Sequence, residues 1–505
     1  MASTSAAAIP IPVPGAQSAM RQPRQIYMLF LTEMWERFSY YGMRALLVLY
    51  LVNSLKYDRA DALQLYATYT SLVYIAPIVG GYLADKWLGK RRAVLIGAIV
   101  MAMGHFAMAF PSLLVFALGL LIIGNGFFKP NISTIVGGLY GDNDPRRDGG
   151  FTIFYMGVNL GAFIAPLVCG ALGEKLGWHY GFAAAGVGMV IGVIVFSVGQ
   201  RMLGTLGFPP GREVTEQSSL TPKDWTTILV TSVMMIAVVY VVIHGWNLVN
   251  PAQFGITPFA ACLYILLAVA LFMLLRHSMD RARNAADPEA LTTIEIHRII
   301  AILIMGFFVI FFWMGFEQAG GTMNLFADKQ VDRQLFGWEI PTSYFQSLNP
   351  MLIFILGPVF TMLWLWLDTS RFRISTPAKM AVGMIILGLG FIVLAMAQGL
   401  ADTTGPVGAE WLFFVYFFHT VGELCLSPVG LSMVTKLAPV RLVSLMMGIW
   451  TTANFIANYL AGILEKLLEG SGFPLYWFLV ASSIGAGVVL LLITPWLKKL
   501  MHGVG

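Results

Sequence analysis

Long apolar runs recur almost from end to end of this 505-residue chain, interrupted by glycines, prolines and clusters of charge. A helix needs about 20 apolar residues to cross the hydrocarbon core of a bilayer. Charged residues make up 11% of the sequence, against about 25% in ordinary soluble domains, so we expect an integral membrane protein. The runs predict fourteen spans that begin near residues 26, 61, 91, 112, 149, 179, 225, 257, 296, 343, 376, 410, 441 and 474.

The basic residues test this arrangement independently. Of the 31 Lys and Arg residues, 22 fall in loops on the same side as the N-terminal tail and six fall in loops on the other side. Basic residues collect in cytoplasmic loops, so the asymmetry supports a multi-pass protein with cytoplasmic N- and C-termini. The other three cations, Arg37, Arg44 and Lys129, lie within predicted spans.

The two longest polar connections, 201–224 and 278–295, flank the seventh and eighth spans. This spacing divides the chain into six helices, an inserted pair and six more helices. Two six-helix bundles that face each other across a midplane site are typical of the major facilitator fold, an all-α membrane architecture of alternating-access transporters. The expected divisions are a disordered cytoplasmic tail at 1–25, bundles at 26–200 and 294–501, and linkers with the inserted pair at 201–293.

The first span carries a polar stripe on an otherwise apolar helix. Glu33, Glu36, Arg37, Tyr40 and Arg44 are spaced i, i+3, i+4, i+7 and i+11, which places them on one helical face. An ionisable residue at membrane depth costs about 2.5–3.5 kcal/mol on insertion scales and usually faces the interior of a bundle or a substrate path. The alternative is a static structural ion pair, because such pairs also occur in plain scaffolds.

Motifs recur along the chain in a recognisable combination. They are Glu33 to Tyr41 (ExxERFxYY), the Gly80 to Arg92 loop, Phe128-Lys129-Pro130-Asn131, Phe154 to Gly161, Trp313 with Glu317-Gln318, and Gly422 to Pro428. Together these motifs resemble the proton-coupled oligopeptide transporter family of the major facilitator superfamily. The resemblance covers roughly residues 26–500, and the helix pair at 225–277 is similar to the extra pair of bacterial members.

The resemblance implies a symporter that imports di- and tripeptides with protons across a plasma membrane, the bacterial inner membrane. The residues implied in proton coupling are Glu33, Glu36, Arg37, Lys129 and Glu317, with an ion pair of Lys129 and Glu317 joining the two bundles. Those implied in peptide binding are Arg44, Tyr40, Tyr41, Tyr74, Lys129, Asn159, Trp313, Asn349, Glu423 and Trp450.

Within this set, the family pattern assigns the peptide carboxylate to Arg44 and Lys129, the amino terminus to Glu423, and the peptide backbone to Asn159 and Asn349. Each role has a structural alternative. The Lys129 pair could be static, the tyrosines and tryptophans could be packed aromatics, and the asparagines could join helices by hydrogen bonds.

Other chemistry has less support in the sequence. His419, four residues before Glu423, could form a metal pair or a proton relay, but a core histidine with satisfied hydrogen bonds is favoured. We expect free thiols at Cys169, Cys262 and Cys425, no metal, no cofactor and no nucleic-acid partner, and a monomer should suffice. A transporter of another solute, a channel and an intramembrane enzyme are the rival functions. The sequence has no HExxH or GxSxG motif at membrane depth, which argues against an intramembrane enzyme.

Overall fold

The computed structural model describes residues 21–141, 144–208, 226, 291–370, 374–439 and 442–503. The first bundle consists of α1 (Arg24–Leu49), α2 (Arg59–Leu83), α3 (Lys90–Ala107), α4 (Leu114–Gly138), α5 (Arg147–Ala165), the short α6 (Ala171–Lys175) and α7 (Trp178–Gly199). The second consists of α10 (Thr293–Phe316), the short α11 (Thr322–Gln330), α12 (Leu348–Thr369), α13 (Thr376–Thr404), α14 (Glu410–Leu437), α15 (Val443–Leu468) and α16 (Leu475–Leu500).

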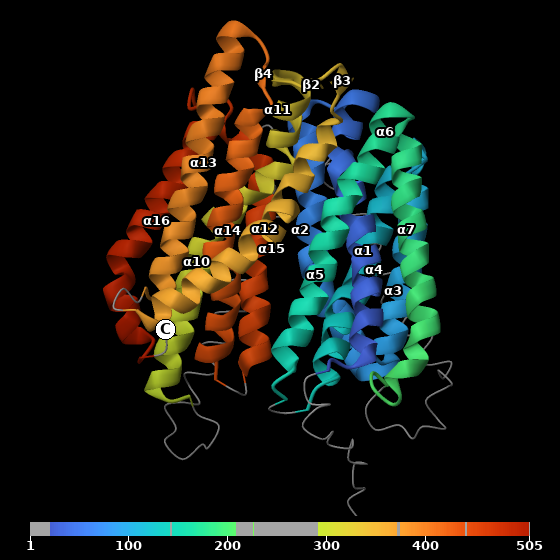
Figure 1. Ribbon diagram of the computed structural model, residues 1–505, viewed down its shortest axis with the longest axis vertical. Coiled ribbons are helices and arrows are strands. Elements are labelled where there is room, and N and C mark those ends of the chain that lie inside the picture. Colours follow the sequence, from blue (N-terminus) through green and yellow to red (C-terminus); the bar gives the residue numbers. More distant parts are fainter. Residues whose placement is uncertain are drawn as a thin grey trace, which may run out of the picture.

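Several α-helices are joined to short π-helical or 3-10 segments. Tyr50–Ser54 continues α1, Pro166–Gly170 (η4) joins α5 to α6, and Thr342–Ser347 (η8) runs directly into α12. The described residues also form four two-residue strands. Strand β1 (Val331–Asp332) pairs in parallel with β4 (Val407–Gly408), and β2 (Gln334–Leu335) forms an antiparallel hairpin with β3 (Trp338–Glu339). The end of the molecule that carries this hairpin, at the top of Figure 1, is called the hairpin end below.

The helices begin where the apolar pattern predicts. Twelve of the fourteen predicted spans start within three residues of the start of an observed helix, when η8 is counted as the beginning of α12. The seventh and eighth spans lie outside the described residues except for residue 226. Nine helices in the described part of the chain are long and apolar enough to cross a membrane. The charged helix α1 is not among these nine, because its stripe lowers its mean hydropathy.

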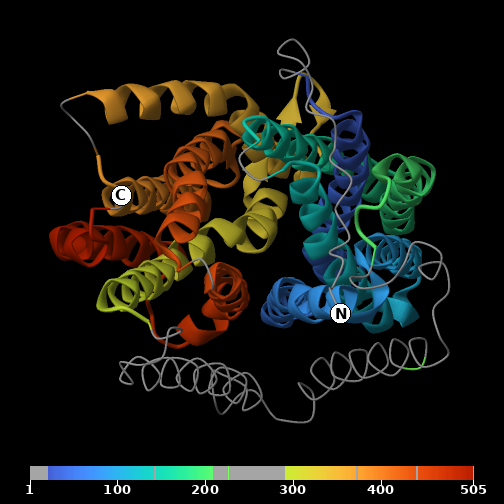
Figure 2. The same cartoon turned by 90° about the horizontal axis from the view of Figure 1, so that it is seen from below.

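The two bundles lie side by side, each around its own apolar core (Figures 1 and 2). They meet mainly where α2 packs on α15 and where α5 and η4 pack on α12 and η8. The short helix α11 contacts both cores. Leu325 lies in the core of the first bundle and Phe326 in that of the second, while Asn324 donates a hydrogen bond to the carbonyl of Ala45 at 2.9 Å.

Glycines permit a close helix contact in the first bundle, between α3 and α4. A Cβ atom on Gly97 would lie 2.5 Å from the carbonyl oxygen of Gly124, and one on Gly124 would lie 2.7 Å from that of Gly97. Each backbone therefore occupies the space that a side chain on the other would need. Small residues at such crossings let membrane helices approach closely, because lipid supplies no hydrophobic force between them.

We expect Gly97→Ala to destabilise the protein by about 1–3 kcal/mol, the usual cost of inserting a methyl group into a close-packed contact. The measurement is the thermal unfolding midpoint of the full chain in detergent. Gly357→Ala is the matched control, because a Cβ on this helical glycine of α12 meets no atom of the described residues within 4 Å. Equal midpoints for the two variants would contradict the close contact.

Candidate functional site

A cavity of about 420 Å³ lies between the two bundles. Side chains from α1, α2, α4 and α5 line it on one side, and side chains from α10, η8, α12 and α14 line it on the other. The volume falls within the range of small-molecule sites, about 300–1,000 Å³. A ligand in this cavity would therefore contact both bundles at once.

Most of the residues predicted for the site meet at this cavity. Those on its wall are Arg37, Tyr40, Tyr41, Arg44, Tyr74, Lys129, Asn159, Trp313, Glu317, Asn349 and Glu423. Glu33 and Glu36 do not line the wall and lie behind it, in contact with Arg37. Trp450 is not on the wall either. It is buried in the second bundle, where its ring fills the space beside Gly430 of α14.

The stripe on α1 forms a cluster of two carboxylates and two cations. Nε of Arg37 lies 3.0 Å from Oε1 of Glu33 and 2.7 Å from Oε2 of Glu36, and Lys129 of α4 forms an ion pair with Glu33. Asn125 of α4 also donates to Glu36, at 3.4 Å. The side chain of Lys129 is 32% exposed and that of Glu33 is 0% exposed, so Lys129 is the partner of Glu33 that a ligand in the cavity reaches most easily.

The second cation of α1, Arg44, makes the contact between the bundles. It forms an ion pair with Glu317, which follows the last residue of α10, and its Nε donates to the hydroxyl of Tyr66 at 2.5 Å. The guanidinium also lies over the ring of Tyr41, 5.9 Å from its centroid. These contacts leave Arg44 well satisfied although only 10% of its side chain is exposed.

The predicted pair of Lys129 and Glu317 is wrong in this structure. Lys129 pairs with Glu33 inside its own bundle, and Glu317 pairs with Arg44. The physical reason is position along α1. Arg44 lies about three helical turns beyond Glu33, at the level where α10 ends. Three cations line the cavity, namely Arg37, Arg44 and Lys129, and Arg44, the one at this level, pairs with the carboxylate of the opposite bundle.

The wall formed by the second bundle carries a carboxylate of a different kind. Glu423 of α14 accepts a hydrogen bond from the side-chain amide of Asn349 at 2.8 Å, and Asn349 also donates to Thr420 at 3.1 Å. Among the described residues, Glu423 has no cation within 4 Å. The cavity thus has cations on the wall of the first bundle and a carboxylate without a cation on the wall of the second.

Several residues that line the cavity were not among the site residues predicted from the sequence. They are Asn125, Tyr155, Gln346, Tyr416 and Ser427. Helical spacing could have found most of them, because Tyr416 and Ser427 share a face of α14 with Glu423, and Tyr155 precedes Asn159 by one turn. Asn125 likewise precedes Lys129 by one turn of α4.

The structure corrects the prediction for His419. Its side chain is buried against Phe391, with ring centroids 4.6 Å apart, as expected of a core histidine. The residue nevertheless lines the cavity, and its Nε2 has no hydrogen-bond partner among the described residues. Cys169 and Cys425 are buried free thiols, and Cys262 lies outside the described residues.

A sequence model of the POT family matches residues 91–474. The chain belongs to this family. Its similarity to the uncharacterized transporter YclF of Bacillus subtilis is 37% identity over 497 residues, covering 95% of this chain and 96% of the relative. A di-/tripeptide transporter of Lactococcus lactis subsp. cremoris is 34% identical over 503 residues, covering 96% of this chain and 97% of the relative.

Solved structures agree with the sequence comparison. The crystal structure of a variant POT peptide transporter in complex with alafosfalin superposes with a TM-score of 0.79 at 33% identity, covering 97% of this chain and all of that one. The predicted family and the predicted fold class are therefore confirmed. Because the family and the relatives are transporters, the intramembrane enzyme considered for the sequence is excluded.

Proposed function

We propose that this POT family member is a proton-coupled symporter that imports di- and tripeptides by alternating access. The observation that carries the proposal is the distribution of charge around the cavity. Cations face it from the first bundle and Glu423, without a cation of its own among the described residues, faces it from the second. A peptide carries a carboxylate and an ammonium group at opposite ends, so it complements both walls. The names of the Lactococcus relative and of the alafosfalin-bound transporter support a peptide-like substrate.

In the proposed complex, the peptide carboxylate binds Lys129 and Arg44, and the ammonium group binds Glu423. Asn159 and Asn349 provide amide groups on opposite walls for the peptide backbone. A hydrogen bond to a charged group contributes about 1.5–3 kcal/mol, more than a bond between neutral groups. Tyr40, Tyr41 and Tyr74 present aromatic surfaces to the cavity, and so does Trp313. These rings and the apolar parts of the wall tolerate different peptide side chains.

Proton coupling follows from competition for the cations. A substrate carboxylate that draws Lys129 away leaves Glu33 with Arg37 alone, and Arg37 already serves Glu36. A buried carboxylate with less positive charge nearby binds a proton more readily. The buried Oε2 of Glu33 has no hydrogen-bond partner among the described residues, which supports this carboxyl group as a proton acceptor. The pair of Arg44 and Glu317 offers a second exchange of the same kind.

The proposed orientation has both termini in the cytoplasm and the hairpin end outside, in a bacterial inner membrane. The asymmetry of the basic residues supports it. In this orientation the contacts of α1 with α11, and of η4 with η8, close the outer end of the cavity. One chain contains both walls of the site, so a monomer suffices for transport.

The central test is uptake of labelled dialanine into proteoliposomes that contain the purified protein. We expect accumulation above equilibrium only with an inward proton gradient, because uphill transport needs that driving force. Empty liposomes provide the background, and labelled nitrate provides a comparison solute. Uptake that ignores the gradient would contradict symport, and uptake of nitrate alone would favour the rival transporter of another solute.

Glu423→Gln should remove the selection for a free peptide amino group. The wild type should prefer dialanine over N-acetyl-dialanine by roughly tenfold to a hundredfold, the value of one charge-assisted contact. The measurement is inhibition of dialanine uptake by each ligand. Glu410→Gln is the control, because Glu410 lies on the same helix and is exposed. A Glu423→Gln protein that keeps its preference for dialanine but loses its dependence on the gradient would instead assign Glu423 to proton transfer with His419.

Glu36→Gln should abolish accumulation driven by the gradient while leaving peptide counterflow. The introduced amide would be unable to take up a proton, and Arg37 would bind Glu33 more strongly for lack of a competitor. The measurement compares gradient-driven uptake with exchange of labelled for unlabelled dialanine at equal pH on both sides. Normal accumulation in this variant would show that coupling occurs at another carboxylate.

A further inference from the structure

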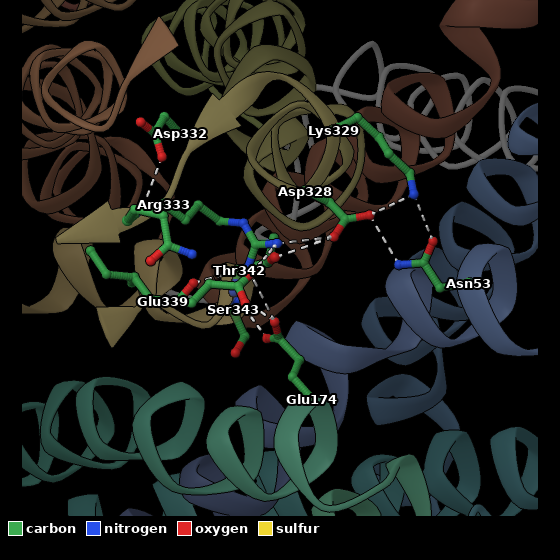
Figure 3. Close-up of polar contacts among 11 residues, drawn as sticks. Asn53, Glu174, Asp328, Lys329, Asp332, Arg333, Glu339, Thr342 and Ser343 are labelled. Carbon is green, nitrogen blue, oxygen red and sulfur yellow. Dashed lines mark hydrogen bonds and ion pairs between the residues drawn. The ribbon is translucent and has the colours of Figure 1, made fainter. Parts of the chain in front are cut away.

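A polar cluster joins the two bundles at the hairpin end (Figure 3). One member of this cluster, Glu174, lies near the end of α6 in the first bundle and binds backbone N–H groups of the second bundle. Oε2 of Glu174 accepts a hydrogen bond from the backbone N–H of Thr342 at 2.7 Å, and Oε1 accepts one from that of Ser343 at 2.9 Å. Both donors belong to η8 of the second bundle, 168 and 169 residues further along the chain.

These two bonds have the chemistry of a helix cap. The first N–H groups of a helix have no partner within it, and a side-chain oxygen normally accepts from them. The residue at the N-cap position of η8 is Pro341, which makes no side-chain cap. The carboxylate of Glu174 replaces that cap from the other bundle. Its negative charge also lies at the positive end of the helix dipole.

The surroundings hold Glu174 against η8. A Cβ atom on Gly170 of η4 would overlap the side chain of Ser343, so only glycine permits this approach. Arg333 lies 4.0 Å from Glu174 and 2.9 Å from Glu339, and it donates to the carbonyl of Ile340 at 2.9 Å. Arg333 therefore fixes the hairpin that leads into η8, and Glu174 fixes the first residues of η8 itself.

The capped helix carries part of the cavity wall. η8 continues directly into α12, and the combined helix presents Gln346, Asn349 and Ile353 to the cavity. Asn349 in turn donates to Glu423. A second contact along the same interface, from the hydroxyl of Ser347 to the carbonyl of Phe163 at 2.8 Å, holds this helix against α5. The position of Asn349 thus depends on how the beginning of η8 is held.

We propose that Glu174 is a positioning residue for transport. It caps the substrate-binding helix η8–α12 from the opposite bundle while the hairpin end is closed, and it releases this helix when the bundles separate there. Glu174 does not line the cavity and acts through α12. The role rests on the proposed alternating access, but the cap itself can be measured without transport.

The test compares Glu174→Gln and Glu174→Ala with the wild type. Gln keeps one acceptor oxygen for the two N–H groups, and Ala keeps none. Hydrogen–deuterium exchange of the full chain in lipid nanodiscs, read at Thr342 and Ser343, should accelerate on the order of tenfold in Glu174→Ala and less in Glu174→Gln, because loss of a helix cap opens the first turn. The rate of dialanine uptake should fall in the same order.

Glu339→Gln is the matched control. It also removes a carboxylate beside Arg333, but Glu339 lies on the same side of the interface as η8. Exchange at Thr342 and Ser343 should therefore remain as in the wild type. A Glu339→Gln protein that exchanges as fast as Glu174→Ala would assign the effect to Arg333 and overturn the proposal. Unchanged exchange in both Glu174 variants would also overturn it.

A further measurement separates a moving cap from a permanent one. In the wild type, saturating dialanine should slow exchange at Thr342 and Ser343, because a peptide that bridges the bundles favours closure of the hairpin end. A permanent structural cap would leave exchange unchanged by peptide, and that result would overturn the positioning role. Parallel uptake assays distinguish a failure of the proposed transport function from a failure of the proposed role of Glu174. A wild type that neither binds nor transports dialanine, yet shows the variant effects on exchange, would refute the proposed function while retaining the cap.

Discussion

The structure depends on pairing charges that lipid could not accommodate singly. Removing one partner from a buried ion pair leaves an uncompensated charge, at a cost of about 3–5 kcal/mol. Arg37 and Lys129 meet this requirement for Glu33 and Glu36 inside the first bundle. Arg44 meets it across the interface with Glu317. The same electrostatic requirement therefore governs both the insertion of α1 and the contact between the bundles, and a ligand that brings its own charges can change the balance.

The sequence predicted the fold closely because the membrane leaves few alternatives. An apolar run of about 20 residues can satisfy its backbone in lipid only as a helix, so the start of α2 at Arg59 or α13 at Thr376 could be read from the ends of such runs. The stripe on α1 was equally readable, because charges on an apolar helix must face protein or water. Motif resemblance then placed residues such as Asn159, Asn349 and Glu423 at a common site, although they lie on three helices in two bundles.

Pairings between distant residues could not be read in the same way. Glu317 lies 273 residues from Arg44, and nothing along the chain tells whether Arg44 or Lys129 stands at its level in the membrane. Trp450 matched a family position, but its orientation depends on the room that Gly430 leaves in α14. Glu174 gave no signal at all, since a carboxylate beside Lys175 at the end of a span resembles an ordinary solvated charge. Its two backbone donors become visible only when η8 is seen beside it.

The short helix α11 limits how the two halves can move. It follows α10 of the second bundle, yet Leu325 is packed into the core of the first bundle and Asn324 is bonded to Ala45 there. The chain therefore crosses the interface and is anchored on both sides, so the bundles cannot part at the hairpin end as two complete rigid bodies. Parting them must either expose Leu325 or bend the chain at Gly320 and Gly321, the two glycines between α10 and α11. Glu317 precedes this joint by three residues, so a bend there would turn the carboxylate that Arg44 binds.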